Sequence, residues 1–282
     1  MSEEKPLNER FLALLASKAP DGRQKEQWVQ DFLEENSELL PTTTLLNHGL
    51  QFQAVVSKYA LASEHVCDYA FVTKSSDRWR VTFVELESPD KKIFTMDEQN
   101  PHFTKAFNDA KAQVQRWRTF VKRNEAEALR HLEPLFKPDN MRRMPFEFRY
   151  QLIIGRSDNK NLSPERMGFI VQEEEDTGIQ ILSYDSLIRY WENGPRRKKN
   201  VLAVAGNRLK FKLIHTSPGH MFSYVGPDQL ALSATDKTYF RNLGYEIDTW
   251  TTGELLTVGM GKYGASTSFE DEMEKRRLPK GN

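Results

Sequence analysis

Three acidic residues lie at the ends of two short apolar runs in the first third of the chain. Asp68 precedes the run 69–73, whereas Glu85 and Glu87 lie near the end of the run 79–86 and directly after it. Both runs are rich in β-branched and aromatic residues, and a turn-like segment, 74–77, separates them, so the sequence predicts a β-hairpin. Side chains two apart in a strand share a face, and the start of one antiparallel strand lies beside the end of the next. We therefore expect Asp68 to lie close to Glu85 and Glu87.

Carboxylates that meet at the edge of an apolar sheet repel one another unless a cation lies between them. Hard oxygen ligands of this kind suit Mg²⁺ or Mn²⁺. We predict Asp68 and Glu85 as direct metal ligands, with the backbone carbonyl of Leu86 as a third ligand. A metal held in this way activates a water molecule and neutralises charge on a phosphate, which is the chemistry of phosphodiester hydrolysis. Glu87 is predicted to take a proton or to bind a second metal, because a glutamate cannot supply positive charge.

The composition limits the kind of protein that carries this site. The chain has 282 residues with 38% hydrophobic and 28% charged residues, and its formal net charge is zero. A surface for nucleic acid must therefore be a local patch rather than the whole molecule. The single cysteine, Cys67, fits a reducing compartment, and the histidines form no zinc pattern. Since no apolar run approaches about 18 residues and the N-terminus does not resemble a signal peptide, we expect a soluble, cytoplasmic protein that does not contact a membrane.

The order of the predicted elements is that of an α/β protein with helices covering a sheet. Besides the hairpin, we predict helices over 7–19, 23–40, 102–131 and 184–191 and strands over 50–60, 146–155 and 179–183. The sequence pattern changes after the basic run 196–199. Beyond it we predict strands over 208–215 and 251–258 and a helix near 237–244. The predicted organisation is an N-terminal helix in 1–22, a core domain over 23–200, a C-terminal appendage over 201–260 and a disordered tail over 261–282.

The acidic pattern resembles that of the PD-(D/E)xK nuclease superfamily. That superfamily has an Asp, then Glu-x-Lys on the next strand, then a helix with Gln-x-x-x-Tyr. The matching residues are Asp68, Glu85, Glu87 and Gln113, with Trp117 in place of the tyrosine. The stretches QWVQDFLEENSELL (27–40), VELESP (84–89), LIIGR (152–156) and ILSYDSL (181–187) narrow the match. Together, in this order, they look like the Shedu-type anti-phage nuclease domain, over about residues 23–195.

This resemblance implies a PD-(D/E)xK nuclease-like mixed sheet flanked by helices, here with a small C-terminal appendage. It implies a Mg²⁺- or Mn²⁺-dependent endonuclease that cuts double-stranded DNA in bacterial defence against phage, often as a homo-oligomer, without any organic cofactor. Gln113 is then expected to orient the scissile phosphate or the attacking water.

The chain departs from the family at one position, because Glu87 replaces the usual lysine. Either Glu87 supports catalysis, or a lysine from elsewhere supplies the charge, with Lys91, Lys92 and Lys111 the nearest in sequence. The alternative function is an inactive nuclease-like module that binds DNA or protein as a sensor or scaffold.

Two further groups of residues are predicted to assist the site. Glu26, on the helix expected to back the sheet, is a candidate outer acid. A basic run on the long helix is the candidate contact to the DNA backbone; it comprises Arg116, Arg118, Lys122 and Arg123.

Overall fold

The computed structural model describes residues 5–20, 22–97, 100–218 and 220–256. The helices in these ranges are α1 Leu7–Ala16, α2 Lys25–Glu35, α3 Lys105–Arg123, α4 Glu125–Leu129, α5 Ser157–Lys160, α6 Pro164–Thr177, α7 Tyr184–Asn193, α8 Met221–Tyr224, α9 Ala234–Asn242 and α10 Ile247–Thr251. The strands are β1 Ala54–Ala62, β2 His65–Lys74, β3 Trp79–Leu86, β4 Phe146–Ile153, β5 Ile179–Leu182, β6 Asn200–Ala205, β7 Arg208–Leu213 and β8 Leu230–Ala231. The predicted tail, 261–282, lies outside the described residues.

One mixed sheet organises the molecule. Its eight strands run in the order β5-β4-β3-β2-β1-β6-β7-β8. The strands β1, β2 and β3 form an antiparallel meander, and β4 and β5 join β3 in parallel. On the other side, β6 pairs with β1 in parallel, and β7 and β8 follow it. The predicted α/β class, a mixed sheet flanked by helices, is confirmed.

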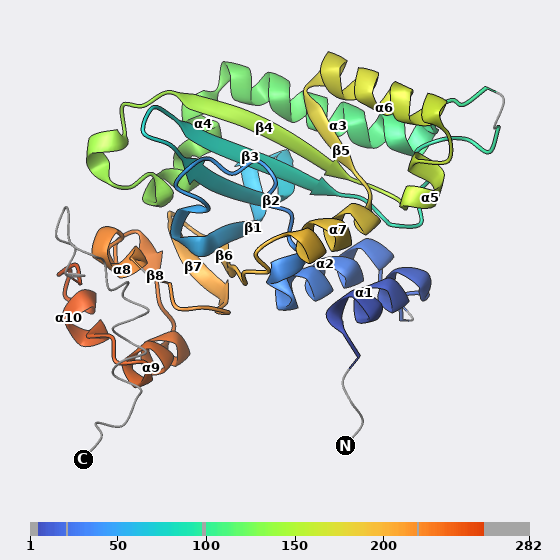
Figure 1. Ribbon diagram of the computed structural model, residues 1–282. Helices are drawn as coiled ribbons and strands as arrows, with labels where there is room; N and C mark the ends of the chain where they lie inside the picture. The colour runs from blue at the N-terminus through green and yellow to red at the C-terminus, as the bar shows by residue number, and fades with distance from the viewer. Residues whose placement is uncertain (1–4, 21, 98–99, 219, 257–282) are drawn as a thin grey trace.

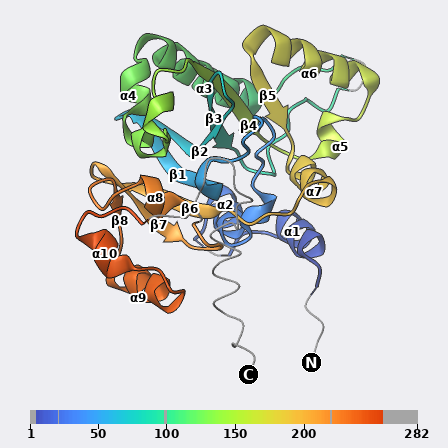
Figure 2. The ribbon, with the colours of Figure 1, turned by 60° about the vertical axis from the view of Figure 1, so that its left-hand side comes forward.

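Helices cover both faces of this sheet. The helices α3, α4 and α6 lie over one face, and α1, α2 and α7 lie over the other (Figure 1). Figure 2 shows the same two layers from the side, with α8, α9 and α10 grouped near β6, β7 and β8. Two buried hydrophobic clusters correspond to the two faces, and the larger one continues from α3 into the C-terminal helices. The hairpin that carries the acids is therefore buried on both sides.

The predicted helix over 102–131 is two helices in the structure. Thr104 caps the first helix, α3, because its side-chain oxygen accepts the N–H of Phe107 at 3.1 Å. The apolar stripe of α3 is buried as expected from its spacing. The helix ends at Arg123, and the side-chain amide of the next residue, Asn124, donates to the carbonyl of Phe120 at 3.2 Å and thereby competes with a further helical turn. The shorter helix α4 then begins at Glu125.

The C-terminal segment extends the sheet. Strand β6 was not predicted, yet Ala54, Val55 and Val56 of β1 pair with its first three residues. The strand predicted over 251–258 is wrong in the part that the structure describes, because Thr251 is the last residue of α10 and no strand follows it up to residue 256. The division of the chain into a core and an appendage at residue 200 stays a prediction, and that boundary falls at the first residue of β6.

Gly155 fixes the loop that follows β3 against the end of β4. Its φ is +64°, and a Cβ placed there would collide with the carbonyl oxygen of Lys91. We expect Gly155→Ala to destabilise the protein by at least about 2 kcal/mol, because the left-handed backbone alone costs a non-glycine residue roughly 1–2 kcal/mol. Chemical unfolding measures this change.

The control is Gly168→Ala in α6, where nothing lies within 4 Å of an added Cβ. This variant is expected to be more stable than wild type by about 0.5–1 kcal/mol, because alanine favours a helix interior. Equal stability of the two variants would contradict the role given to Gly155.

Within the described ranges, none of the helices has both the length and the apolar character needed to cross a membrane.

Candidate active site

Asp68 and Glu85 lie on neighbouring antiparallel strands. Tyr69 pairs with Val84, so the same register places Asp68 directly opposite Glu85. Opposed residues share a face and have Cβ atoms about 4.5–5.5 Å apart. Both side chains are buried, with Asp68 4% and Glu85 7% exposed. The hairpin therefore brings these two predicted acids together.

The backbone between the two acids is also fixed. One carboxylate oxygen of Asp68, Oδ2, accepts the N–H of Leu86 at 2.6 Å. The N–H of Glu87 donates to the carbonyl of Ile153 in β4 at 2.8 Å. Because the carbonyl and N–H of a trans peptide point in opposite directions, the carbonyl of Leu86 points away from β4 and towards β2, which carries Asp68.

Glu87 lies directly after β3 and is held at its backbone. The buried hydroxyl of Tyr184 donates to the carbonyl of Glu87 at 2.7 Å. Its carboxylate forms an ion pair with Lys91. Glu87 is therefore held next to Glu85, but Lys91 already neutralises its charge.

Gln113 reaches the site from α3. Its side-chain amide donates to Oε1 of Glu85 at 2.5 Å. Trp117, one turn further along α3, is 1% exposed and belongs to the hydrophobic core. The helix thus supplies one polar contact to the acids, while the residue that replaces the family tyrosine supports packing.

The acids influence one another electrostatically. Burial, followed by the negative charges of Asp68 and Glu87, raises the pKa of Glu85 well above its usual range. The same causes in the same order raise the pKa of Glu26 on α2. Glu26 therefore lies within electrostatic reach of the site, on the face opposite to Gln113, and its role as an outer acid stays a prediction.

Lys58 also lies at the site, although no pattern in the sequence indicated this. Ser57 pairs with Tyr69 and Tyr59 with Cys67, so Lys58 of β1 lies opposite Asp68. Its ammonium group forms an ion pair with Oδ1 of Asp68. Lys58 has a φ of +47°, which is uncommon for a residue with a side chain and even more so inside a strand. A positive charge therefore lies at the site, although it comes from a different strand than the family pattern implies.

The three lysines proposed from sequence as replacements behave differently. Lys91 pairs with Glu87, whereas Lys111 pairs with Glu173 at 3.0 Å and lies over the rings of Phe103 and Phe107. The amine of Lys92 lies 3.0 Å from the sulfur of Met96. Of these three, only Lys91 contacts an acid of the candidate site.

The donor set fits a hard divalent cation with part of its shell left to water. Two opposed carboxylates and one backbone carbonyl are oxygen donors of the kind that Mg²⁺ uses, and Mg²⁺ keeps several water ligands. Among the residues that the structure describes, no three His, Cys, Asp or Glu side chains are arranged to hold a metal by themselves. A cation at Asp68 and Glu85 would offset the burial and the neighbouring negative charges that together raise the pKa of Glu85.

The basic run on α3 divides between two sides of the helix, because residues two apart in a helix point in nearly opposite directions. Arg116 and Arg123 line one shallow groove together with His65, whose ring lies 5.4 Å from that of Phe120. Arg118 faces the other way and donates to the carbonyl of Thr177 at the end of α6. The run therefore does not form a single basic strip.

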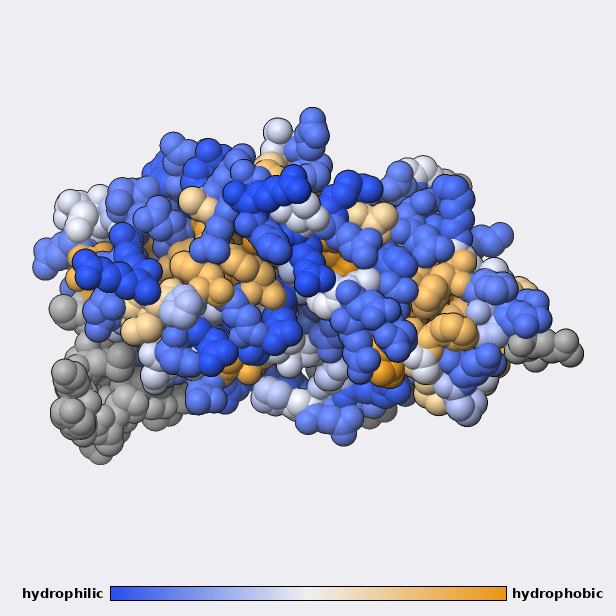
Figure 3. All heavy atoms as spheres, turned by 90° about the horizontal axis from the view of Figure 1, so that it is seen from above, coloured by the Kyte–Doolittle hydropathy of each residue, from blue (hydrophilic) through white to orange (hydrophobic). Residues whose placement is uncertain are grey.

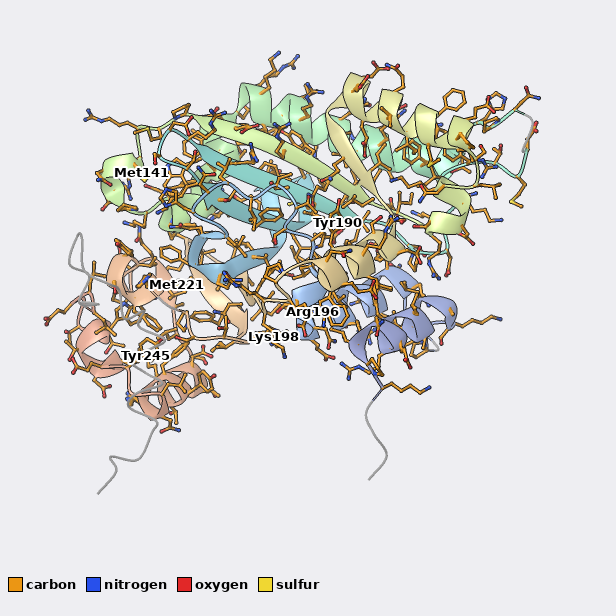
Figure 4. All side chains as sticks on the ribbon, in the orientation of Figure 1. Met141, Tyr190, Arg196, Lys198, Met221 and Tyr245 are labelled. Atoms are coloured by element: carbon orange, nitrogen blue, oxygen red, sulfur yellow. The ribbon has the colours of Figure 1, made fainter. Side chains whose placement is uncertain are left out.

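The second basic run, 196–199, follows α7. Arg196 stacks on the ring of Trp191 at 4.3 Å, and the amine of Lys199 is buried against the carbonyl of Ser37 at 3.0 Å. Figure 4 shows Tyr190 on α7, with Arg196 and Lys198 in the segment that follows this helix. The side chains of Arg196 and Lys199 therefore contact other residues of the same chain.

A family model and a solved structure are similar to this chain. The family model of the Shedu protein SduA, C-terminal, matches residues 23–188, which is more than half of the chain and includes Asp68, Glu85, Glu87 and Gln113. The solved structure of restriction endonuclease FokI is similar over 68% of this chain and 31% of that chain, with 12% sequence identity and a TM-score of 0.33. The chain therefore spans about a third of FokI. No curated protein matches. The match over residues 23–188 shows that the chain belongs to the family of the C-terminal domain of the Shedu protein SduA.

Proposed function

We propose that this protein is a metal-dependent DNA endonuclease that acts in the cytoplasm in defence against phage. The observation that carries the proposal is the row of Lys58, Asp68 and Glu85 across three adjacent strands, with Gln113 bonded to Glu85. Asp68, Glu85 and the carbonyl of Leu86 would hold the ion, which would be Mg²⁺ or Mn²⁺. This ion supplies positive charge to the phosphate and makes a water molecule more acidic.

The other residues of the proposed site supply charge, hold a ligand in place or accept a proton. Lys58, which pairs with Asp68, would supply to the phosphate the positive charge that Glu87 cannot provide. Gln113 keeps the carboxylate of Glu85 in place through its amide. Glu87 accepts a proton when its contact with Lys91 opens, and Glu26 adds negative charge from α2.

Plasmid nicking tests the proposal directly. Supercoiled plasmid is incubated with the full chain and Mg²⁺ or Mn²⁺, and parallel samples contain EDTA. Conversion to the open-circular or linear form in the metal samples alone supports the enzyme. A protein that never cuts with either metal, yet retards DNA in a gel, supports the alternative, an inactive DNA-binding module. The observation in favour of that alternative is the ion pair that occupies Glu87.

The DNA is proposed to approach over the face that carries α3 and α6. This face is largely hydrophilic with separate apolar patches (Figure 3). From Gln113 to Arg123 the helix rises about 15 Å, roughly half a turn of duplex DNA. Because the net charge is zero, assembly of several chains into a homo-oligomer would raise affinity through multivalency.

The division of the basic run leads to a prediction. The double variant Arg116→Ala/Arg123→Ala is expected to weaken DNA binding and to reduce the slope of log K against log salt by about 2, since each lost phosphate contact removes roughly 0.9. Arg118→Ala is the control, because the bond of Arg118 to Thr177 occupies its guanidinium. Fluorescence anisotropy at several salt concentrations measures the DNA affinity and its salt dependence for both variants. A larger loss in the Arg118 variant would place the DNA on the other side of α3.

A further inference from the structure

A buried carboxylate connects the candidate site to the C-terminal strands. Glu34, near the end of α2, is 2% exposed. Its Oε1 accepts the hydroxyl of Ser57 at 2.5 Å, and its Oε2 forms an ion pair with Lys212 of β7 at 2.5 Å. The ring of His215 donates to the backbone carbonyl of Glu34 at 2.6 Å. Glu34 therefore joins α2, β1 and β7 at one point.

This point is next to Lys58. Ser57 directly precedes Lys58 in β1 and is itself 2% exposed. A left-handed residue inside a strand persists only when its surroundings hold it. The ion pair with Asp68 holds the side chain of Lys58, and the bond from Ser57 to Glu34 holds the backbone before it.

Ser57 and Gln30 bond Glu34 from inside the family match, but two further groups that hold Glu34 lie outside it. Lys212 and His215 follow residue 188, where that match ends. The segment containing His215 is itself fixed to β6, because the side-chain oxygen of Asn200 accepts the N–H groups of His215 and Thr216 at 2.8 and 3.1 Å. Lys212 of β7 thus neutralises the buried charge of Glu34 beside Ser57.

We propose that Glu34 is a positioning residue for Lys58 and that Lys212 keeps Glu34 in place, so that the C-terminal strands complete the active site. This inference rests on the proposed nuclease function. It assigns to β7 a role in the chemical step, in addition to its role in the sheet. Loss of Lys212 would leave a buried carboxylate unpaired, which would then draw solvent or a different partner and release Ser57.

The test compares Lys212→Met with Lys210→Met. Lys210 lies two residues earlier on the same face of β7, is exposed, and has no ion pair in the described part of the chain. Lys212→Met is expected to lower kcat for plasmid nicking about 10- to 100-fold, the usual effect of removing an outer support of a site, with KM nearly unchanged. Lys212→Arg is expected to restore most of the rate. Lys210→Met is expected to match wild type.

Ser57→Ala is a second variant, since it breaks the link to Glu34 without leaving a charge unpaired. It is expected to lower kcat in the same direction as Lys212→Met. Wild-type kcat in both variants, or a change confined to KM, would overturn the proposal.

Hydrogen exchange measured by mass spectrometry separates this inference from the proposed function. Faster exchange over residues 54–62 in Lys212→Met, and not in Lys210→Met, supports the link to Lys58 even if the wild type cuts no DNA. Equal exchange in the two variants overturns it, whatever the nicking assay gives.

Discussion

Asp68→Ala is expected to reduce metal-dependent DNA cleavage by about a thousandfold or more. The variant removes one of two opposed carboxylates, and the cation that Asp68 is proposed to hold would supply several kcal/mol of charge stabilisation, at roughly tenfold in rate for each 1.4 kcal/mol. It also removes the acceptor for the N–H of Leu86 and the partner of Lys58. Plasmid nicking with Mn²⁺ measures the rate.

A binding experiment shows whether the loss comes from the metal. At a concentration about 100 times its Kd, Mn²⁺ should stabilise the wild type by about 2.7 kcal/mol, because it binds only the folded state. Asp68→Ala should show little of this effect. Asp77→Ala is the control, since Asp77 lies exposed in the turn between β2 and β3 and pairs with Arg78. Full metal stabilisation in Asp68→Ala would remove Asp68 from the ligand set.

Lys58→Met is expected to lower kcat by about 10²–10³, the typical effect of removing one group that stabilises charge in the transition state. It should not weaken Mn²⁺ binding, because the lost cation competes with the metal for Asp68. Without metal, the variant should be less stable by about 1–3 kcal/mol, since Asp68 stays buried without its partner.

The combination of a lower kcat with preserved metal affinity distinguishes Lys58 from a ligand. Thermal unfolding with and without Mn²⁺, together with the nicking rate, gives both quantities, and Lys210→Met again serves as the unpaired lysine. If Lys58→Met cut DNA at the wild-type rate, the charge at the phosphate would have to come from Lys91, which pairs with Glu87.

Local sequence patterns predicted the hairpin and the opposed positions of Asp68 and Glu85. Apolar runs with a short turn determine which residues oppose one another, so Asp68 and Glu85 follow from local chemistry. The apolar spacing of α3 likewise located Gln113 on a helix that packs on the same sheet. The first result depends on residues that are near one another in the chain, and the second depends on the regular spacing of apolar residues within one helix.

The role of Lys58 depends on a register that the sequence does not reveal. Ala62 pairs with His65, but Ala60 pairs with Val66, so the register shifts by one residue between them. Without this irregularity Tyr59, and not Lys58, would oppose Asp68. The partner of β1 on its other side, β6, comes from about 140 residues later in the chain, and no local pattern predicts such a pairing.

The placement of β1 inside the sheet has a practical consequence for dissecting this protein. Its two neighbours are β2 and β6, and β6 begins at Asn200, after the matched range 23–188 ends. A polypeptide shortened to that range would leave the N–H and C=O groups of 54–56 unpaired along an apolar edge. Open edges of this kind recruit strands from other molecules. We expect such a fragment to precipitate or form fibrils, which would be mistaken for evidence that the domain is unstable by nature.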